Sequence, residues 1–200
     1  MPISVDLAKF NSDAALPHGC KVSHIQSAMV EWIDFLGFIN RQLNSRKLDR
    51  LEAFMMTANF SSLVGEFVAS RIPKYCTSLV RNRYHNGHPD LVPKGHYDGD
   101  SVLHGVSGIE IKASRYDRGW QGHNAEECWL LVFVFKANSA SDAFKDKPPK
   151  PFGFKAVFGA QLTKADWQFS GRSKTSRRTI TASVTKAGFE KLTANWIYRV

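Results

Sequence analysis

Two short segments place carboxylates and an amine where they could hydrolyse a phosphodiester bond. Asp90 follows a proline, and Glu110 and Lys112 lie about twenty residues further on, in an alternating run. Side chains two apart on a strand point to the same face, so Glu110 and Lys112 would project together while Ile109 and Ile111 face the core. Two carboxylates can hold a hard divalent cation, and the lysine would lie beside a bound water. The pattern therefore predicts metal-dependent phosphodiester cleavage.

The same residues also fit a purely structural interpretation. Pro89 and Asp90 are common in turns, and alternating charge is common on edge strands. Asp98 and Asp100 are competing acidic candidates, but they lie in a glycine-rich turn, where aspartate is favoured for local backbone bonding. Histidines crowd this region without the ligand spacing of a tetrahedral zinc site. A turn and an edge strand therefore remain the alternative.

The segments Pro89-Asp90 and Glu110-Ile111-Lys112 resemble the two signature elements of the PD-(D/E)xK nuclease superfamily, the restriction-endonuclease-like proteins. The resemblance extends from about Glu66 to Asn124, and elsewhere it rests on the order of elements alone. It implies an α/β fold with a restriction-endonuclease-like core, in which a mixed central β-sheet of about four to five strands is flanked by helices. It also implies a Mg²⁺-dependent DNA endonuclease similar to type II restriction enzymes, with Mn²⁺ as a substitute cation.

The resemblance also assigns roles to individual residues. Asp90, Glu110 and the backbone carbonyl of Ile111 would ligate Mg²⁺, while Lys112 would orient or deprotonate the attacking water. In-line attack would leave 5′-phosphate and 3′-hydroxyl ends. In this superfamily the helix before the catalytic hairpin often brings a further acid towards the metal, and Glu66 occupies that place. An ion pair at a helix edge is the alternative for Glu66.

A second auxiliary residue is expected after the signature. Nucleases of this superfamily often complete the active site with a glutamine from the next element, usually a helix, and Gln121 is the candidate in this chain. The match is loose, because Gly119 and Gly122 argue against a regular helix here. Trp120 could stack on substrate, although a buried anchor for the loop is the favoured role.

Length, charge and cysteine content limit the classes of protein to which this chain could belong. Two hundred residues with 43% hydrophobic content predict one nuclease domain over residues 1–200. No apolar run approaches the roughly 20 residues that span a bilayer, and no signal-peptide pattern is present, so we expect a cytoplasmic protein without membrane contact. The three cysteines are far apart and outside any Cys-x-x-Cys arrangement, so neither a disulfide framework nor a cysteine zinc site is indicated.

The positive charge of the chain favours a polyanionic partner. The net charge is +9, and the basic C-terminal segment 171–200 holds seven basic residues against one acidic residue. Double-stranded DNA is the leading partner, because neutralising each phosphate releases counterions. A solvated basic surface is the alternative for any single arginine. Types of residue that contact phosphates or base edges occur at Arg81, Arg83, His88, His123, Asn124, Arg172, Lys174, Arg177 and Arg178.

Hydrophobic periodicity predicts the elements that must position these residues. Residues 1–22 are expected to form an irregular N-terminal arm, and apolar side chains at helical spacing predict a helix over 24–43. A second helix is predicted over 48–71, with a break near 59–62 and a stop at Pro73.

Alternation and apolar runs predict the strands. The third of them is so apolar that both of its faces should be covered. A crossover helix between the last two core strands is not evident, and a proline-rich loop stands in its place. The expected strands cover 90–93, 108–114, 128–136 and 154–162, with short helices near Thr163 and over 185–192.

Other functions remain open at this point. A repair, phage or mobile-element nuclease of the same fold would use the same residues. A DNA-binding module without hydrolysis would not need all three of Asp90, Glu110 and Lys112. A histidine-based nuclease would require a compact metal finger, and none is apparent in this sequence around His85 or His123. A homodimer is a further expectation, since cutting both strands of a palindrome needs two centres related by a two-fold axis.

Overall fold

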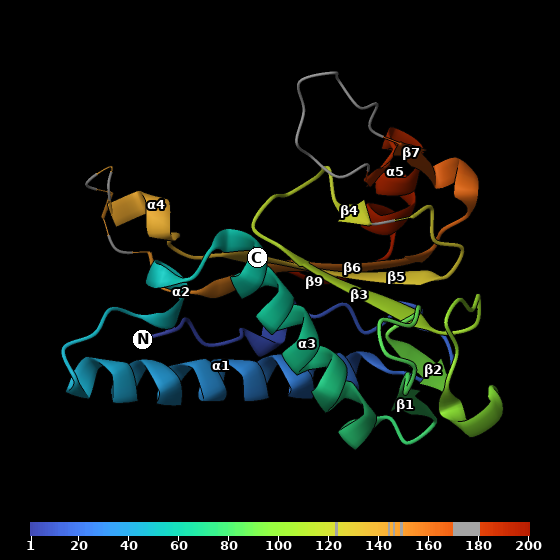
Figure 1. Cartoon of the computed structure of the whole chain (residues 1–200), viewed down its shortest axis with the longest axis horizontal. Helices are drawn as coiled ribbons and strands as arrows, with labels where there is room; N and C mark the ends of the chain where they lie inside the picture. Colours follow the sequence, from blue (N-terminus) through green and yellow to red (C-terminus); the bar gives the residue numbers. More distant parts are fainter. Residues whose placement is uncertain (123, 144, 146, 149, 170–180) are drawn as a thin grey trace.

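The chain folds around a mixed β-sheet (Figure 1). The computed structural model describes residues 1–122, 124–143, 145, 147–148, 150–169 and 181–200. The strands β3 (Ile109–Ser114) and β5 (Trp129–Lys136) run parallel, and the other neighbouring strands of this sheet are antiparallel. The predicted mixed α/β architecture is confirmed, but this sheet has six strands where about four to five were expected. In the order β1-β2-β3-β5-β6-β9, the strands are Leu79–Arg81, Leu91–Pro93, Ile109–Ser114, Trp129–Lys136, Gly153–Gln161 and Trp196–Arg199.

Strand β5 is covered on both faces, as its apolar sequence predicts. Leu131 and Phe133 pack into the larger hydrophobic cluster, on the side of the long helices. Leu130 and Val132 pack into a second cluster on the opposite face. The alternation follows from the two-residue period of a strand. A single strand therefore joins both cores, and its parallel neighbour β3 carries the candidate site.

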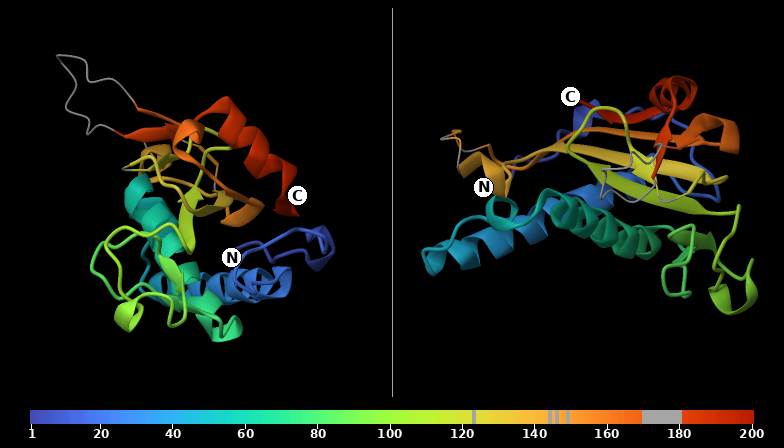
Figure 2. Two further views of the ribbon diagram at one scale, coloured as in Figure 1. Left: turned by 90° about the vertical axis from the view of Figure 1, so that its right-hand side faces the viewer. Right: turned by 45° about the horizontal axis from the view of Figure 1, so that its top comes forward.

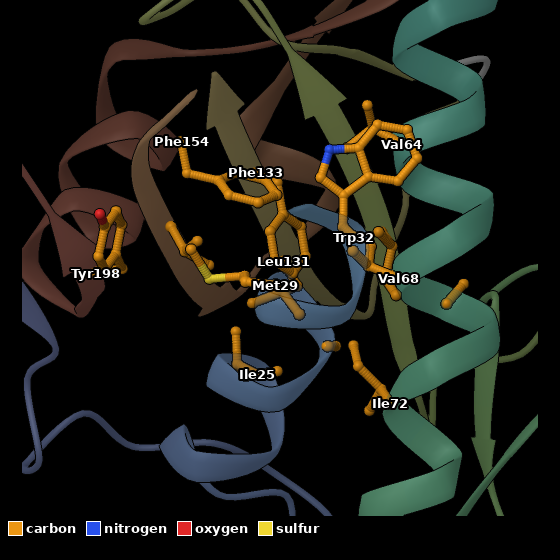
Figure 3. Close-up of a cluster of buried hydrophobic side chains, with 14 of the residues drawn as sticks. Ile25, Met29, Trp32, Val64, Val68, Ile72, Leu131, Phe133, Phe154 and Tyr198 are labelled. Atoms are coloured by element: carbon orange, nitrogen blue, oxygen red, sulfur yellow. The ribbon is translucent and has the colours of Figure 1, made fainter. Parts of the chain in front are cut away.

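Helices α1 (Val22–Ser45) and α3 (Thr57–Tyr75) cover one face of the sheet (Figures 1 and 2). Figure 3 shows Trp32 of α1 beside Val64 and Val68 of α3, with Phe133 of β5 in the same cluster. Trp32 is fully buried and meets Phe60 edge-on. Complete burial contributes roughly 1.5–3 kcal/mol for each large apolar side chain, so this layer fixes α3 against the sheet.

A smaller layer lies on the opposite face (Figure 2). Strands β4 (Gln121–Gly122), β8 (Ala182–Val184) and β7 (Trp167–Phe169) form a second sheet beside α5 (Lys186–Ala194). Trp120 anchors this layer as expected, since it is 3% exposed and its indole N–H donates to the Tyr116 carbonyl at 2.9 Å.

The prediction for the second helix is partly wrong. The break lies at Met55 and Met56, which have extended backbone between α2 (Leu51–Phe54) and α3, and not near 59–62. Asn40 fixes the start of α2 instead, because its side-chain oxygen accepts from the Leu51 amide at 2.9 Å and ties α2 to α1.

Pro73 does not stop the helix either. It lies in the last turn of α3, where the missing N–H removes a single helical bond. The preceding residue, Ile72, is fully buried, and its carbonyl accepts from the Cys76 amide at 2.9 Å. Packing of Ile72 in the core therefore allows the helix to continue past Pro73 to Tyr75.

The remaining elements follow the sequence more closely. The N-terminal arm is largely irregular and is held against the sheet where the Asn11 amide donates to the Ile197 carbonyl at 3.0 Å. A short 3-10 helix begins after Thr163, and α5 matches the predicted closing helix. β5 and β6 are antiparallel, so they need no crossover helix. Among the described residues, no helix is long and apolar enough to cross a membrane.

Candidate active site

The hairpin of β2 and β3 brings Asp90 to Glu110. The strands meet at Leu91 and Ile109. Gly108 permits this approach, because a side chain there would lie 2.2 Å from the Leu91 carbonyl oxygen. Directly beside this contact, Oδ2 of Asp90 accepts from the Ile111 amide at 2.7 Å. The two predicted elements therefore converge as the sequence predicts.

Glu110 is the most deeply buried acid of the site, with 1% of its surface exposed. Its Oε1 is bound by the Lys112 ammonium, and its Oε2 lies 3.2 Å from Nδ1 of His88. Burial works to raise the pKa of Glu110, but Lys112 and His88 outweigh it and hold this pKa below its usual value. Glu110 is therefore a carboxylate at neutral pH, and it keeps Lys112 charged by raising the pKa of that amine.

Asp90 shares this environment. Burial first, and then repulsion from Glu110, raise the pKa of Asp90 to about 7, against the opposing effects of Lys112 and the Ile111 amide. Two acids in such proximity resist ionising together. A cation between them would remove that penalty, so the arrangement suits a metal better than a proton alone.

A third acid, Glu126, lies beside these residues and was not among the predicted site residues. Its side chain is 8% exposed, with Oε1 3.8 Å from the Lys112 ammonium and 4.0 Å from Nδ1 of His88. Neither carboxylate oxygen has a hydrogen-bond partner among the described residues. Burial and then Glu110 raise the pKa of Glu126 to about 7. Burying a carboxylate without a hydrogen bond is costly, and a cation at this point would offset that cost.

Two sets of donors could accordingly hold a cation. The predicted set consists of Asp90, Glu110 and the Ile111 backbone. The second set consists of His88, Glu110 and Glu126, whose ligand atoms lie within 4.8 Å of one another. Glu110 is common to both sets, so the site could hold one cation in either position or two that share this carboxylate. Oxygen donors dominate both sets, which favours Mg²⁺ or Mn²⁺ over softer metals.

A cleft of about 1240 Å³ opens onto His88, Asp90, Glu110, Ile111 and Lys112, and Glu126 lies outside its lining. Glu66 lies on its wall, but its carboxylate is paired with Arg81 at 2.5 Å. Gln121 reaches the cleft from strand β4, not from a helix, and its amide lies 3.4 Å from the Ser183 hydroxyl. The predicted site residues that line the cleft are Glu66, Arg81, Arg83, His88, Asp90, Glu110, Ile111, Lys112 and Gln121.

Other candidates lie elsewhere. Asn124 is exposed and does not line the described part of this cleft. Asp100 accepts from the Gly95 amide at 2.6 Å, which is the turn role expected of it. The predicted DNA contacts His123, Arg172, Lys174, Arg177 and Arg178 lie outside the described residues.

Comparison with known proteins adds no family to this geometry. Searches against models of protein families, against curated proteins and against solved structures each returned no match.

Proposed function

We propose that this protein is a metal-dependent endonuclease that hydrolyses phosphodiester bonds in double-stranded DNA. The observation that carries the proposal is the convergence of Asp90, Glu110 and Lys112 on one cleft. The hydrogen bond from the Ile111 amide fixes Asp90 against the strand that bears the other two. A turn and an edge strand without chemistry would not require a buried Glu110 with a half-buried Asp90 and Lys112 at one point.

The donors fit Mg²⁺. Asp90, Glu110 and the Ile111 carbonyl would hold it, and the unpartnered carboxylate of Glu126 provides a further oxygen ligand nearby. When bound, the cation would stabilise negative charge on the phosphate and lower the pKa of a bound water. Glu66 would have only an auxiliary role. Its carboxylate is paired with Arg81 and must leave that ion pair before it can bind a cation.

The chain's own side chains have distinct tasks. Lys112 donates to Glu110 and would turn towards a water or a phosphate oxygen once a cation shares that carboxylate. His88 holds the other oxygen of Glu110 and so fixes its orientation. The Ile111 amide keeps Asp90 directed into the cleft. In-line attack by the oriented water would give 5′-phosphate and 3′-hydroxyl ends.

Charge supports DNA as the substrate. The chain carries a net charge of +9, which outweighs the negative charge of the acidic centre and favours binding of a polyanion. Arg81 and Arg83 lie on the wall of the cleft, where they could neutralise backbone phosphates. We further propose a restriction-endonuclease-like core and a type II restriction role, with cleavage by two copies as the expected arrangement. Discrete fragments from a long DNA would support that role, whereas a smear would indicate a nonspecific nuclease.

A plasmid-cleavage assay tests the proposed activity. Wild-type protein should nick or linearise supercoiled plasmid with Mg²⁺ or Mn²⁺ and leave it intact with EDTA. Lys112→Ala should lower the cleavage rate by roughly 10²–10⁴-fold, the range for loss of a positioned acid–base group. Lys155→Ala is the matched control, because Lys155 is exposed and pairs with Asp117 away from the cleft.

Two outcomes would contradict this function. Cleavage by Lys112→Ala at the wild-type rate would rule out the assigned mechanism. DNA binding by wild-type protein without cleavage in either metal would identify the chain as a binding module.

A further inference from the structure

A second group of ligand-type side chains lies outside the nuclease cleft. The ligand atoms of Cys20, His24 and Cys76 lie within 4.8 Å of one another. Cys20 precedes α1, His24 lies in the first turn of that helix, and Cys76 caps the C-terminal end of α3. None of the three lines the cleft. Residues 20 and 76 are distant in the chain, so their spacing predicts no metal site, and the fold brings them together.

The backbone holds this group in place. The Cys20 amide donates to the Pro17 carbonyl at 3.0 Å, which closes the turn before α1. Ser78 fastens that turn to the end of α3, since its hydroxyl donates to the His18 carbonyl at 2.6 Å. Gly19 has a φ of +72°, and a side chain there would lie 3.1 Å from the Ser78 hydroxyl. The two cysteine-bearing segments are therefore tied together independently of any ligand.

The chemistry of the group suits a soft cation. Both cysteines are free and buried, with exposed fractions of 6% for Cys20 and 2% for Cys76. Two sulfurs and an imidazole favour Zn²⁺ over the Mg²⁺ expected in the cleft.

We propose that Cys20, His24 and Cys76 form a zinc site that joins the start of α1 to the end of α3. Binding would release the protons of both thiols and form two metal–thiolate bonds and one metal–imidazole bond. The described residues place no fourth Cys, His, Asp or Glu in the group. Water or the Ser78 hydroxyl, 3.2 Å from the Cys76 sulfur, would complete a tetrahedron.

The position of His24 defines one structural requirement. Its Nδ1 accepts from the Lys21 amide at 3.1 Å. Ligation through Nδ1 would replace that bond, and ligation through Nε2 would require the tautomer protonated at Nδ1. His24 is half-buried, whereas both cysteines are buried, so a cation would enter from the histidine side.

Cobalt titration of the full-length, metal-free protein under a non-thiol reductant tests this site. Co²⁺ should add near-ultraviolet thiolate charge-transfer absorption that saturates at one equivalent and disappears when Zn²⁺ is added. Cys20→Ser and Cys76→Ser should lose this absorption. Cys128→Ser is the matched control, because Cys128 is also buried and free but does not belong to the group. The Co²⁺-bound Cys128→Ser protein should show the same absorption as wild type.

A milder variant guards against misfolding of the cysteine variants. His24→Gln keeps an oxygen that can accept from the Lys21 amide, and circular dichroism should show that it is folded. It should bind Co²⁺ at least tenfold more weakly, as expected for loss of a ligand. No charge-transfer absorption in folded wild-type protein would overturn the site. Equal Co²⁺ affinity in wild type and His24→Gln, or absorption that survives in both cysteine variants, would do the same.

Discussion

Oδ2 of Asp90 accepts a hydrogen bond from the amide of Ile111 at 2.7 Å. Ile111 separates Glu110 from Lys112, so one backbone bond sets the position of the acid just before β2 relative to the two charged side chains on β3. The carboxylate is held by a rigid strand and not by a mobile loop. Such support is what a site needs if its donors are to stay in place before a ligand arrives.

Asp90→Asn separates the charge of this residue from its structural role. Asparagine can still accept from the Ile111 amide, but it cannot supply a negative ligand. We expect the cleavage rate to fall by about 10³-fold, corresponding to several kcal/mol of lost charge stabilisation. Unfolding in EDTA should show equal or greater stability, because Asp90 is repelled by Glu110.

Asp98→Asn is the control, since this turn acid does not line the cleft. Cleavage within a few-fold of wild type in Asp90→Asn would exclude Asp90 as a ligand.

Glu126→Gln tests whether the unpartnered acid belongs to the site. Removing its charge should stabilise the metal-free protein, because both carboxylate oxygens are buried without a hydrogen-bond partner among the described residues. A gain of about 1 kcal/mol would raise Tm by roughly 2–4 °C for a chain of this size. Cleavage should fall at least tenfold if Glu126 ligates the cation. These effects are measured by thermal unfolding in EDTA and by plasmid cleavage with Mg²⁺.

The neighbouring acid supplies the control for that experiment. Glu127 is 42% exposed and pairs with Lys164 at 3.2 Å, so Glu127→Gln should change neither measurement appreciably. Full cleavage activity in Glu126→Gln would leave Glu126 a structural residue and would favour the predicted set of Asp90 and Glu110.

Glu31 makes the contact between α1 and α3 dependent on pH. Its carboxylate is bound by Arg71, Lys74 and Tyr75, and Arg71 first of all lowers the pKa of Glu31 to about 2. The stabilisation is therefore complete above the ordinary carboxyl pKa of 4.5 and is lost as the pH falls towards 2. Because Lys74 is 52% exposed, solvent screening limits the contribution to about 1 kcal/mol.

Urea unfolding between pH 7 and pH 3 measures this contribution. Glu31→Gln should be less stable than wild type by about 1 kcal/mol at pH 7, and the difference should shrink below pH 4.5. Glu190→Gln is the control, because Glu190 is 65% exposed and lies 3.8 Å from Lys186. A difference that stays constant over this range would show that the ion pairs are not its source.

The sequence predicted those parts of the molecule that local patterns determine. The long α1 and the apolar β5 have a periodicity that few other structures satisfy, and Glu110 and Lys112 share a face for the same reason. Short strands such as β1 and β7 were missed because three residues carry little pattern and their pairing depends on distant partners. The start of α2 likewise depends on Asn40, which lies in another helix.

The same limit applies to the site. Glu126 lies before β5, and nothing in its neighbourhood distinguishes it from the adjacent Glu127. Its proximity to Glu110 follows from the parallel pairing of β3 with β5, in which Ile109 lies opposite Trp129. Strand pairing across the intervening segment cannot be deduced from the period of either strand. Residues that depend on such long-range pairing become visible only in the folded chain.

Gly108→Ala tests whether the close approach of β2 to β3 sets the geometry of the site. Gly108 has a φ of +148°, and a side chain there would lie 2.2 Å from the Leu91 carbonyl oxygen and 2.4 Å from Cγ of Pro89. Strain at such a position costs about 1–3 kcal/mol, and relief of the clash must move β2 away from β3. We therefore expect both urea stability and plasmid cleavage to fall. Gly37→Ala is the matched control, because Gly37 lies in α1 and does not line the cleft, and the atoms nearest to the added carbon are 3.5 Å or more away, so the helix should gain roughly 0.5–1 kcal/mol. If Gly108→Ala kept both stability and cleavage, the hairpin contact at Leu91 would not be what holds Asp90 beside Glu110.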